Sequence, residues 1–268
     1  FLDLFDLEPG QAAYDFHDML KARTMKLKQH TQIVLPATYQ KKRKKGGTDK
    51  GRGQRNLQDE ATRAWNIYTA LYYKSKGTPW RLVRHSSQLT TCYVGISFYQ
   101  SLDGKTLQTS IAQVFNELGD GIIVRGGTAK ISKEDRQPHL TSDDAYELLY
   151  DALETYRKVH LNLPARAVIH KTSAYSDHER DGFLRAIEAQ RVSIADLLNV
   201  RQSNTRLFRH GSYPPLRGML LSVEPRTHIL YTRGSVEFFQ TYPGMYVPRP
   251  LEFQRDRTEQ TAEFLAEE

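Results

Sequence analysis

The stretch Ser142–Gln190, SDDAYELLYDALETYRKVHLNLPARAVIHKTSAYSDHERDGFLRAIEAQ, decides the fold class. Its apolar residues first recur at three- and four-residue steps, which predicts a helix over 142–160 with one buried face. The apolar run from Pro164 to His170 predicts a strand, and residues 176–190 predict a second helix. Helix, strand and helix in this order favour a mixed α/β domain with a partly parallel sheet.

Further strand signals lie on both sides of this stretch. The run from Cys92 to Tyr99 is rich in aromatic and aliphatic residues, and Gly121–Val124 reads as a strand between two turns. Short strands alternating with turns are expected after residue 200, at 206–209, 218–223, 228–231 and 236–239. The polar ending, 259–268, has a helical pattern.

The first 85 residues have a different character. Residues 11–30 and 57–76 are expected to form helices, and 31–36 a short buried strand ended by proline. The second helix has an apolar face from Ala61 to Tyr72 and stops at Gly77-Thr78-Pro79. We therefore expect a domain boundary near residue 85.

The charge balance points to a polyanionic partner. The chain has 268 residues and a net charge of +7, which favours nucleic acid over other partners. The segment Lys41–Arg55 holds eight Lys or Arg and four Gly, so it cannot pack a core. It is either a phosphate-contacting loop or a solvated one.

Several classes of protein are disfavoured. Cys92 is the only cysteine, which excludes an internal disulfide and a Cys-based zinc site and fits a reducing, cytoplasmic compartment. The chain contains no run of about 18 apolar residues, so we expect neither a membrane span nor a membrane partner. The start without Met and the polar end at Glu268 suggest a piece of a longer protein.

The two main strands lack the acids that sheet-based nucleases use. Such enzymes hold two divalent metals with carboxylates on neighbouring strands, yet neither 94–99 nor 168–173 contains Asp or Glu. Asp103, Asp120 and Glu179 are the unconventional alternatives, although Glu179 is better placed to pair with Lys171 or Arg180. No HExxH, GxGxxG, P-loop or nucleophile-elbow pattern is present.

Taken in order, the motifs resemble one family, the prokaryotic Argonautes. Ile33-Val34-Leu35-Pro36, the basic region and Tyr73–Trp80 resemble the closing half of a MID domain. Cys92–Tyr99 and Pro164–Ser173 resemble the first and central strands of a PIWI domain. Pro214–Gly218, Leu230–Gly234 and Tyr242–Leu251 are similar to the late part of prokaryotic PIWI domains.

The resemblance implies a partial Rossmann-like MID domain over 1–85 and an RNase H-like PIWI domain with a mixed sheet over 86–268, truncated at its C-terminus. In the MID domain, Lys74 would contact the 5′-phosphate of the guide strand, with Lys76 beside it. Tyr39 would stack on the first base, followed by Arg43. Gln54 or Gln58 would take the place of the pocket glutamine, although the basic loop departs from the family pattern. Mg²⁺ at the guide 5′-phosphate is also implied.

In the PIWI domain, His170, Lys171, Arg209 and Arg217 are the expected nucleic-acid contacts. Cleaving members of the family carry aspartate where this chain has Ser97 and Thr172. The resemblance therefore implies guide-directed binding of RNA or DNA targets without cleavage, and no cofactor for catalysis. Inactive Argonautes of this kind generally act with a separate effector protein, which implies a role in prokaryotic defence.

Two other functions remain open at this point. The chain could be a metal-dependent RNase H-like endonuclease that uses unconventional carboxylates. It could also be a basic scaffold that mainly binds a protein, in which case partner binding would be insensitive to salt, unlike phosphate contacts.

Overall fold

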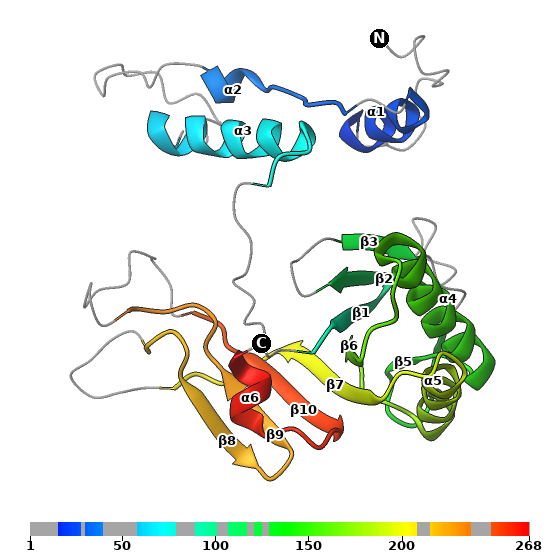
Figure 1. Ribbon diagram of the computed structural model, residues 1–268. Coiled ribbons are helices and arrows are strands. Elements are labelled where there is room, and N and C mark those ends of the chain that lie inside the picture. Colours follow the sequence, from blue (N-terminus) through cyan, green and yellow to red (C-terminus); the bar gives the residue numbers. More distant parts are fainter. Residues whose placement is uncertain are drawn as a thin grey trace. The chain divides into compact units, whose positions relative to one another are not determined.

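The structure is a computed structural model that describes residues 16–27, 30–39, 58–78, 89–100, 107–116, 121–124, 129–207, 215–236 and 248–267 (Figure 1). The chain divides into two compact units, Phe1–Arg81 and Leu82–Glu268. Assigning them to a MID and a PIWI domain stays a prediction. None of the helices among these residues has the length and apolar character needed to cross a membrane.

The first unit contains short helices and one longer one. They are α1 (Phe16–Thr24), the 3₁₀ helix η2 (Met25–Leu27), α2 (Pro36–Tyr39) and α3 (Glu60–Lys74). Asp59 caps α3 by accepting a 2.9 Å hydrogen bond from the backbone N–H of Thr62. Residues 16–27 of the helix predicted over 11–30 are helical, and α3 confirms the helix predicted over 57–76 to within three residues at each end. His30 is not helical, and the basic segment 41–55 lies outside the described residues.

The buried strand predicted over 31–36 is wrong. Residues 31–35 have no regular structure, and Val34 and Leu35 are 48% and 61% exposed. The backbone N–H of Thr38 donates to the Leu35 carbonyl at 2.8 Å, because Pro36 begins the short helix α2. Proline suits a first helical turn, where its missing N–H costs nothing.

The second unit is built on one mixed sheet of eight strands. Their order is β3-β2-β1-β6-β7-β10-β9-β8. The bounds are β1 (Thr91–Gln100), β2 (Leu107–Asn116), β3 (Gly121–Val124), β6 (Arg166–Lys171), β7 (Ile194–Gln202), β8 (Leu220–Glu224), β9 (Thr227–Leu230) and β10 (Leu251–Arg257). The central strands β1, β6 and β7 are parallel, and the remaining pairs are antiparallel. A small hairpin, β4 (Lys130–Ile131) and β5 (Pro138–His139), lies outside this sheet.

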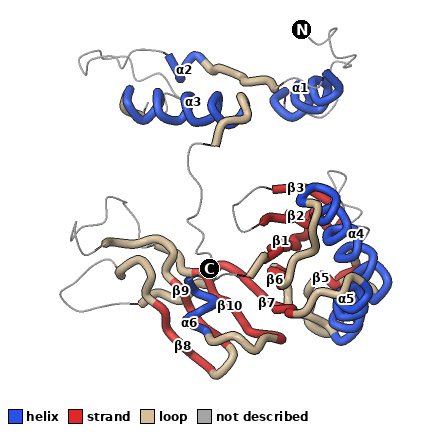
Figure 2. The backbone as a smooth tube through the Cα atoms, viewed as in Figure 1, coloured by secondary structure: helices blue, strands red, loops and turns tan. Residues whose placement is uncertain are grey.

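Two helices cover one face of the parallel strands (Figure 2). They are α4 (Ser142–His160) and α5 (Asp177–Ala189), and the short α6 (Ala262–Glu267) ends the described chain. Thr141 caps α4, and Ser176 with Glu179 forms a capping box at the start of α5. Their apolar faces pack on β1 and β6 in one core cluster, which includes Leu149, Ile169 and Phe183.

A glycine allows α4 and α5 to approach closely. A Cβ at Gly182 would lie 2.1 Å from the Ser142 carbonyl oxygen and 2.9 Å from the Cβ of Ala145. Both distances are shorter than real Cβ contacts, so any larger residue would push the helices apart. Gly182 therefore fixes the spacing of the helical layer that supports β6.

Candidate nucleic-acid interface

Ser97 and Thr172 lie side by side at one edge of the sheet. The last register pair between the parallel strands β1 and β6 is Ile96 with Lys171, and the backbone N–H of Thr172 donates to the Ile96 carbonyl at 3.2 Å. Both side chains are exposed. In open α/β sheets, ligands bind outside the carboxyl ends of parallel strands, and this edge is such a place. It carries the two neutral hydroxyls of Ser97 and Thr172.

Glu179 is buried and committed to other contacts. It has no exposed surface, and its carboxylate lies 2.8 Å and 2.9 Å from Lys171 Nζ. It also accepts hydrogen bonds from the backbone N–H groups of Leu140 and Ser176, at 2.8 Å and 2.9 Å. The predicted pairing of Glu179 with Lys171 is confirmed. Asp103 and Asp120 lie outside the described residues.

No three His, Cys, Asp or Glu side chains gather as a potential metal site within the described ranges.

Lys171 does not face solvent, which argues against the predicted phosphate contact. Alternation along β6 directs its side chain under α5, where it is wholly buried. Its ammonium donates to Glu179 and to the Ala174 carbonyl, the latter at 2.7 Å. Burial lowers the pKa of Lys171, and the Glu179 carboxylate opposes this shift. A phosphate could reach this ammonium only if α5 were displaced.

His170 points to the other side of β6 and is partly buried. Its ring centroid lies 6.5 Å from that of Tyr93 on β1. Burial first, and the Arg166 guanidinium second, lower the pKa of His170, so the imidazole is neutral at pH 7. A contact with nucleic acid at this position would therefore be a hydrogen bond or a stack and not an ion pair.

Four segments meet beyond the carboxyl end of β7, at the same edge as Thr172. The backbone N–H of Ser203 donates to Pro250 O at 3.0 Å, and that of Leu207 donates to the buried Tyr231 hydroxyl at 2.9 Å. The backbone N–H groups of Arg217 and Gly218 donate at 2.8 Å to Ser235 O and Tyr231 O. Tyr231 therefore joins three of these segments, and the bond from Ser203 to Pro250 adds the fourth.

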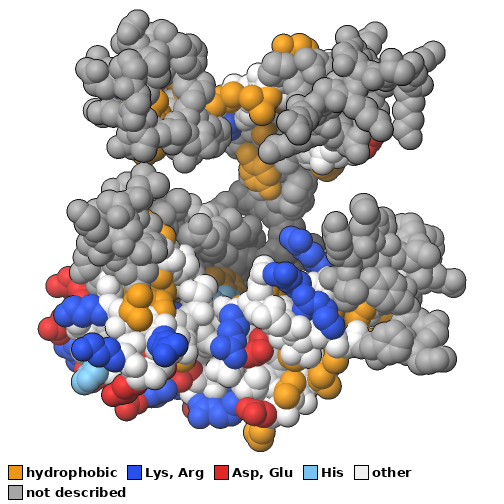
Figure 3. Space-filling model, turned by 180° about the vertical axis from the view of Figure 1, so that it is seen from behind, with side chains coloured by type: hydrophobic (Ala, Val, Ile, Leu, Met, Phe, Trp, Pro, Cys, Tyr) orange, Lys and Arg blue, Asp and Glu red, His pale blue; other side chains and the backbone are white. Residues whose placement is uncertain are grey.

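These segments present exposed arginines, which we call the arginine cluster. Its members are Arg206, Arg217, Arg233 and Arg249. Beside them, Arg201 on β7 pairs with Glu252 on β10 and keeps 50% of its side chain exposed. Figure 3 shows Lys and Arg side chains at several places on the visible face of the larger unit, some of them next to Asp or Glu. A guanidinium group can hold a phosphate with two parallel hydrogen bonds, so such a cluster suits a strand with a phosphate backbone.

The sequence identified this region only in part. Arg217 was expected as a contact and is exposed, whereas Arg209 lies outside the described residues. Arg233 and Arg249 were not singled out, because a lone arginine next to Gly or Pro has no periodic signal. The motifs Thr232-Arg233-Gly234 and Pro248-Arg249-Pro250 were the available hint, since rigid turns hold a side chain at the surface.

The first unit separates the residues expected in one guide pocket. Tyr39 is 70% exposed, and the neighbouring Thr38 carbonyl accepts a 3.2 Å hydrogen bond from Arg63 near the start of α3. Lys74 is the last residue of α3. Eleven residues of helix rise about 16 Å, so Tyr39 and Lys74 lie near opposite ends of α3.

The other expected pocket residues follow the same division. Gln58 is exposed just before α3 and accepts a 3.4 Å hydrogen bond from Asn66. Lys76 is exposed beyond the end of α3, with a left-handed backbone (φ 64°). Lys74 donates to the Thr31 carbonyl and to the Gln32 side-chain oxygen, so a phosphate would have to replace these acceptors. Arg43 and Gln54 lie outside the described residues.

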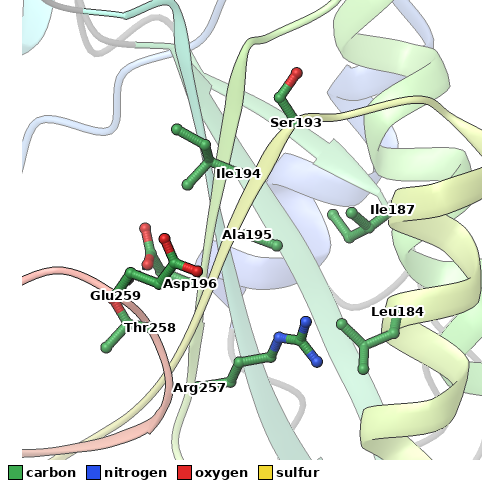
Figure 4. A pocket seen from close by; sticks show the side chains of 9 residues that line it. All are labelled: Leu184, Ile187, Ser193, Ile194, Ala195, Asp196, Arg257, Thr258 and Glu259. Carbon is green, nitrogen blue, oxygen red and sulfur yellow. Dashed lines mark hydrogen bonds between the residues drawn. The ribbon is translucent and has the colours of Figure 1, made fainter.

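A cavity of about 260 Å³ lies toward the opposite edge of the sheet (Figure 4). Leu184 and Ile187 of α5, Asp196 of β7 and the end of β10 line it. Arg257 extends toward Leu184 in this view, and Asp196 is held by Arg166 Nε at 2.6 Å. Arg257 is exposed but distant from the arginine cluster along β10, which makes it a matched control for that cluster.

Solved structures share this fold. The Clostridium butyricum Argonaute with a guide DNA and a 19-mer target DNA matches with a TM-score of 0.57 and 15% identity, over 79% of this chain and 27% of that chain. The A. aeolicus Argonaute matches with a TM-score of 0.54 and 17% identity, over 78% and 28%. A structure of Aa-Ago with externally bound siRNA gives 0.55 and 17%, over 95% and 32%.

The chain thus spans about a quarter to a third of the length of these Argonautes. No family model and no curated protein matches its sequence. The identities are too low to transfer a function, and what they share with this chain is architecture. On that ground, the chain has the fold of the corresponding part of prokaryotic Argonautes.

Proposed function

We propose that this chain is the guide-binding part of an Argonaute-like protein that holds a guide and its nucleic-acid target without cutting them. The strand would cross the sheet edge at Ser97 and Thr172 and continue over the arginine cluster. The observation that carries the proposal is this shared edge: Ser97 and Thr172 lie at the same edge of the sheet as the segments that present four exposed arginines.

The absence of cleavage follows from electrostatics. Two-metal hydrolysis needs carboxylates that hold both cations against the scissile phosphate. At an effective dielectric near 20, each close pair of unit charges contributes about 4 kcal/mol. Ser97 and Thr172 supply neutral oxygens at this edge, and Glu179 is already paired with Lys171. Hydroxyls of this kind can donate to a phosphate oxygen, which favours binding over hydrolysis.

The proposal includes a guide 5′ end held by the first unit. Lys74 and Lys76 at the end of α3 would contact the 5′-phosphate, and the exposed ring of Tyr39 would stack on a base. The oxygens of Thr31 and Gln32, which Lys74 now contacts, are hard ligands that fit a magnesium ion once the ammonium turns to the phosphate. A separate effector protein and a role in prokaryotic defence complete the proposal, since binding without cleavage requires another protein to act.

The test is binding of short labelled strands to the full chain at several salt concentrations. A 5′-phosphorylated RNA or DNA should bind more tightly than its 5′-hydroxyl form, and Lys74→Ala should remove that difference. EDTA should weaken binding of the 5′-phosphorylated strand if magnesium is present at this site. For each phosphate that a variant no longer binds, the slope of log K against log salt should fall by about 0.7 for a single strand.

Variants of the arginine cluster test the sheet edge separately. Arg217→Ala with Arg249→Ala should reduce affinity and the salt slope, whereas the control Arg257→Ala should leave both unchanged. A guide-matched target should remain intact with Mg²⁺ or Mn²⁺. Specific cleavage of that target, or equal losses of affinity from Arg257→Ala and from the cluster variants, would contradict the proposal.

A further inference from the structure

The first residues of β7 have a partner strand on one side only. β10 pairs with β7 as far as Arg257, which lies opposite Leu197. Beyond Arg257 the chain turns away from the sheet, and the Thr258 hydroxyl donates to the Asp196 carboxylate. Residues 194–196 of β7 therefore pair with β6, and no described strand covers their other side.

Ala195 directs its backbone N–H and C=O toward this uncovered side. The N–H of the preceding residue, Ile194, donates to the Ala165 carbonyl next to β6 at 3.2 Å. The backbone groups of successive strand residues point to opposite sides, so those of Ala195 point away from β6. No described backbone group pairs with them there. This edge thus offers one donor and one acceptor, which are the two groups that a strand added antiparallel to β7 would use.

The cavity described above lies against this edge (Figure 4). Ala195 lines it on the strand side, and Leu184 and Ile187 project toward Ala195 from α5. Its volume of about 260 Å³ lies below the range of about 300–1,000 Å³ for pockets that hold drug-sized ligands. The cavity therefore suits one or two residues of a peptide better than a large cofactor.

The charged groups of the cavity divide into a buried pair and an exposed rim. Asp196 is buried and already holds Arg166 Nε at 2.6 Å, so it has little left to offer a ligand. Arg257 and Glu259 are exposed and also line the cavity. Neither forms an ion pair with another described residue. The rim therefore presents one positive and one negative charge to an occupant.

Strand geometry states which side chains such an occupant would carry. Ala195 faces α5, since it packs against the same core cluster as Leu197. Residues that pair directly across two strands have their side chains on the same face of the sheet. The residue opposite Ala195 would therefore place its side chain against the apolar wall of α5, and its neighbours would reach the charged rim.

We propose that this cavity binds an extended peptide segment of a partner protein, which adds to β7 as a short antiparallel strand at Ala195. The segment has an apolar residue between an acidic and a basic one. The site lies at the start of β7 and the arginine cluster beyond its carboxyl end, so both can be occupied together. Identifying this partner with the effector rests on the function proposed above, whereas the site itself does not.

The first test titrates the full chain with two blocked tripeptides, acetyl-Glu-Leu-Lys-amide and acetyl-Lys-Leu-Glu-amide, which place the charges in both orders. At least one should shift the Ala195 amide signal in nitrogen-15 spectra to saturation and slow its hydrogen exchange. Exchange at the Ile194 amide, which already donates to Ala165, should change less. The same peptide with an N-methylated leucine cannot donate to the Ala195 carbonyl and should bind about fivefold more weakly. No saturable shift with either peptide, or no loss on N-methylation, would overturn the proposal.

A matched pair of variants on α5 tests the apolar wall. Leu184→Ser should weaken binding of the better peptide about tenfold, because the leucine of the peptide loses part of its apolar contact. His178→Ser, on the exposed surface of the same helix, should leave the affinity unchanged. If Leu184→Ser fails to fold, Arg257→Gln at the rim should still weaken binding and its dependence on salt. Equal affinities of the wild type and the folded variants would contradict the proposed site.

Two further measurements separate this site from the proposed function and from self-association. A chain that binds the peptide but no nucleic acid would refute the function and keep the site, whereas a chain that binds nucleic acid but neither peptide would refute the site alone. Light scattering of the concentrated chain should show no oligomer that depends on the cavity. Self-association that Leu184→Ser abolishes would assign the cavity to a second copy of the chain and overturn the partner protein.

Discussion

Removing one member of the buried Lys171–Glu179 pair should destabilise the second unit strongly. Glu179→Gln leaves an ammonium with no exposed surface and no counter-charge, which typically costs about 3–5 kcal/mol. Lys171→Met should cost less, because the Glu179 carboxylate keeps the backbone N–H groups of Leu140 and Ser176 as donors. Removing both charges together leaves neither uncompensated.

The magnitude to measure is therefore the coupling between the two substitutions. We expect the double variant Lys171→Met/Glu179→Gln to cost at least about 2 kcal/mol less than the sum of the single variants. Urea unfolding followed by circular dichroism gives the free energy of unfolding for each variant. Arg185→Met is the control, since its exposed ion pairs with Asp143 and Asp181 should contribute less than about 1 kcal/mol. Strictly additive losses of stability would refute the reasoning.

Three further predictions use the same unfolding measurements or a metal titration. Gly182→Ala should lower stability by about 1–3 kcal/mol because α4 and α5 must separate, whereas Gly218→Ala, with open space around it but φ +84°, should lose only the backbone strain of about 1–2 kcal/mol. The pKa of Glu179 is lowered in the folded state, so the stability that its carboxylate adds is complete above the unfolded pKa near 4.3 and is lost as pH falls through the folded pKa. In this acid range, the free energy of unfolding should therefore decline less steeply in Glu179→Gln than in the wild type. An equally steep decline would show that other carboxylates govern the acid sensitivity. Ser97→Asp combined with Thr172→Asp should create Mn²⁺ binding detectable by electron paramagnetic resonance, since it sets one carboxylate on β1 next to another just after β6. Unchanged spectra would show that these positions do not converge.

The helical layer and its central strand could be predicted closely from the sequence. The helix predicted over 142–160 agrees with α4 residue for residue, and 176–190 differs from α5 only by its two caps. Strong caps and an uninterrupted apolar face leave little choice of boundary. The strands β6, β8 and β9 also agree within a few residues, because turns with Gly or Pro bound them.

The strands β2, β7 and β10 and the hairpin of β4 and β5 were not predicted, and β2 and β10 were missed for different reasons. In β10, Leu251–Arg257, charged residues interrupt the apolar pattern, and the structure shows that the two acids among them form ion pairs. Glu252 binds Arg201, and Asp256 binds Arg180 with two hydrogen bonds of 2.8 Å and 2.9 Å. Ion pairs between distant segments leave no local signal. For β2, Leu107–Asn116, the alternation of Gln, Thr and Ser with aliphatic residues is weak.

The candidate site shows the same limit. Ser97 and Thr172 were singled out through the resemblance to Argonautes, and the structure places Ser97 within β1 and Thr172 just after β6. The inward direction of Lys171 depended on strand alternation. The meeting of four segments beyond β7 depended on contacts between residues far apart in sequence. A sequence pattern locates the strands, and with them the edge of the sheet, more readily than it locates the loops that surround this edge.

The bidentate contact between Arg180 and Asp256 ties the start of α5 to the carboxyl-terminal half of β10. Because β10 also pairs with β7 and β9, separating it from the sheet would break the hydrogen bonds to both strands. It would also break the contact between Asp256 and Arg180 of α5. We expect these elements to open as a single cooperative block with a common exchange free energy. A protease that acts on native-state openings would then find β10 as resistant as the helical core.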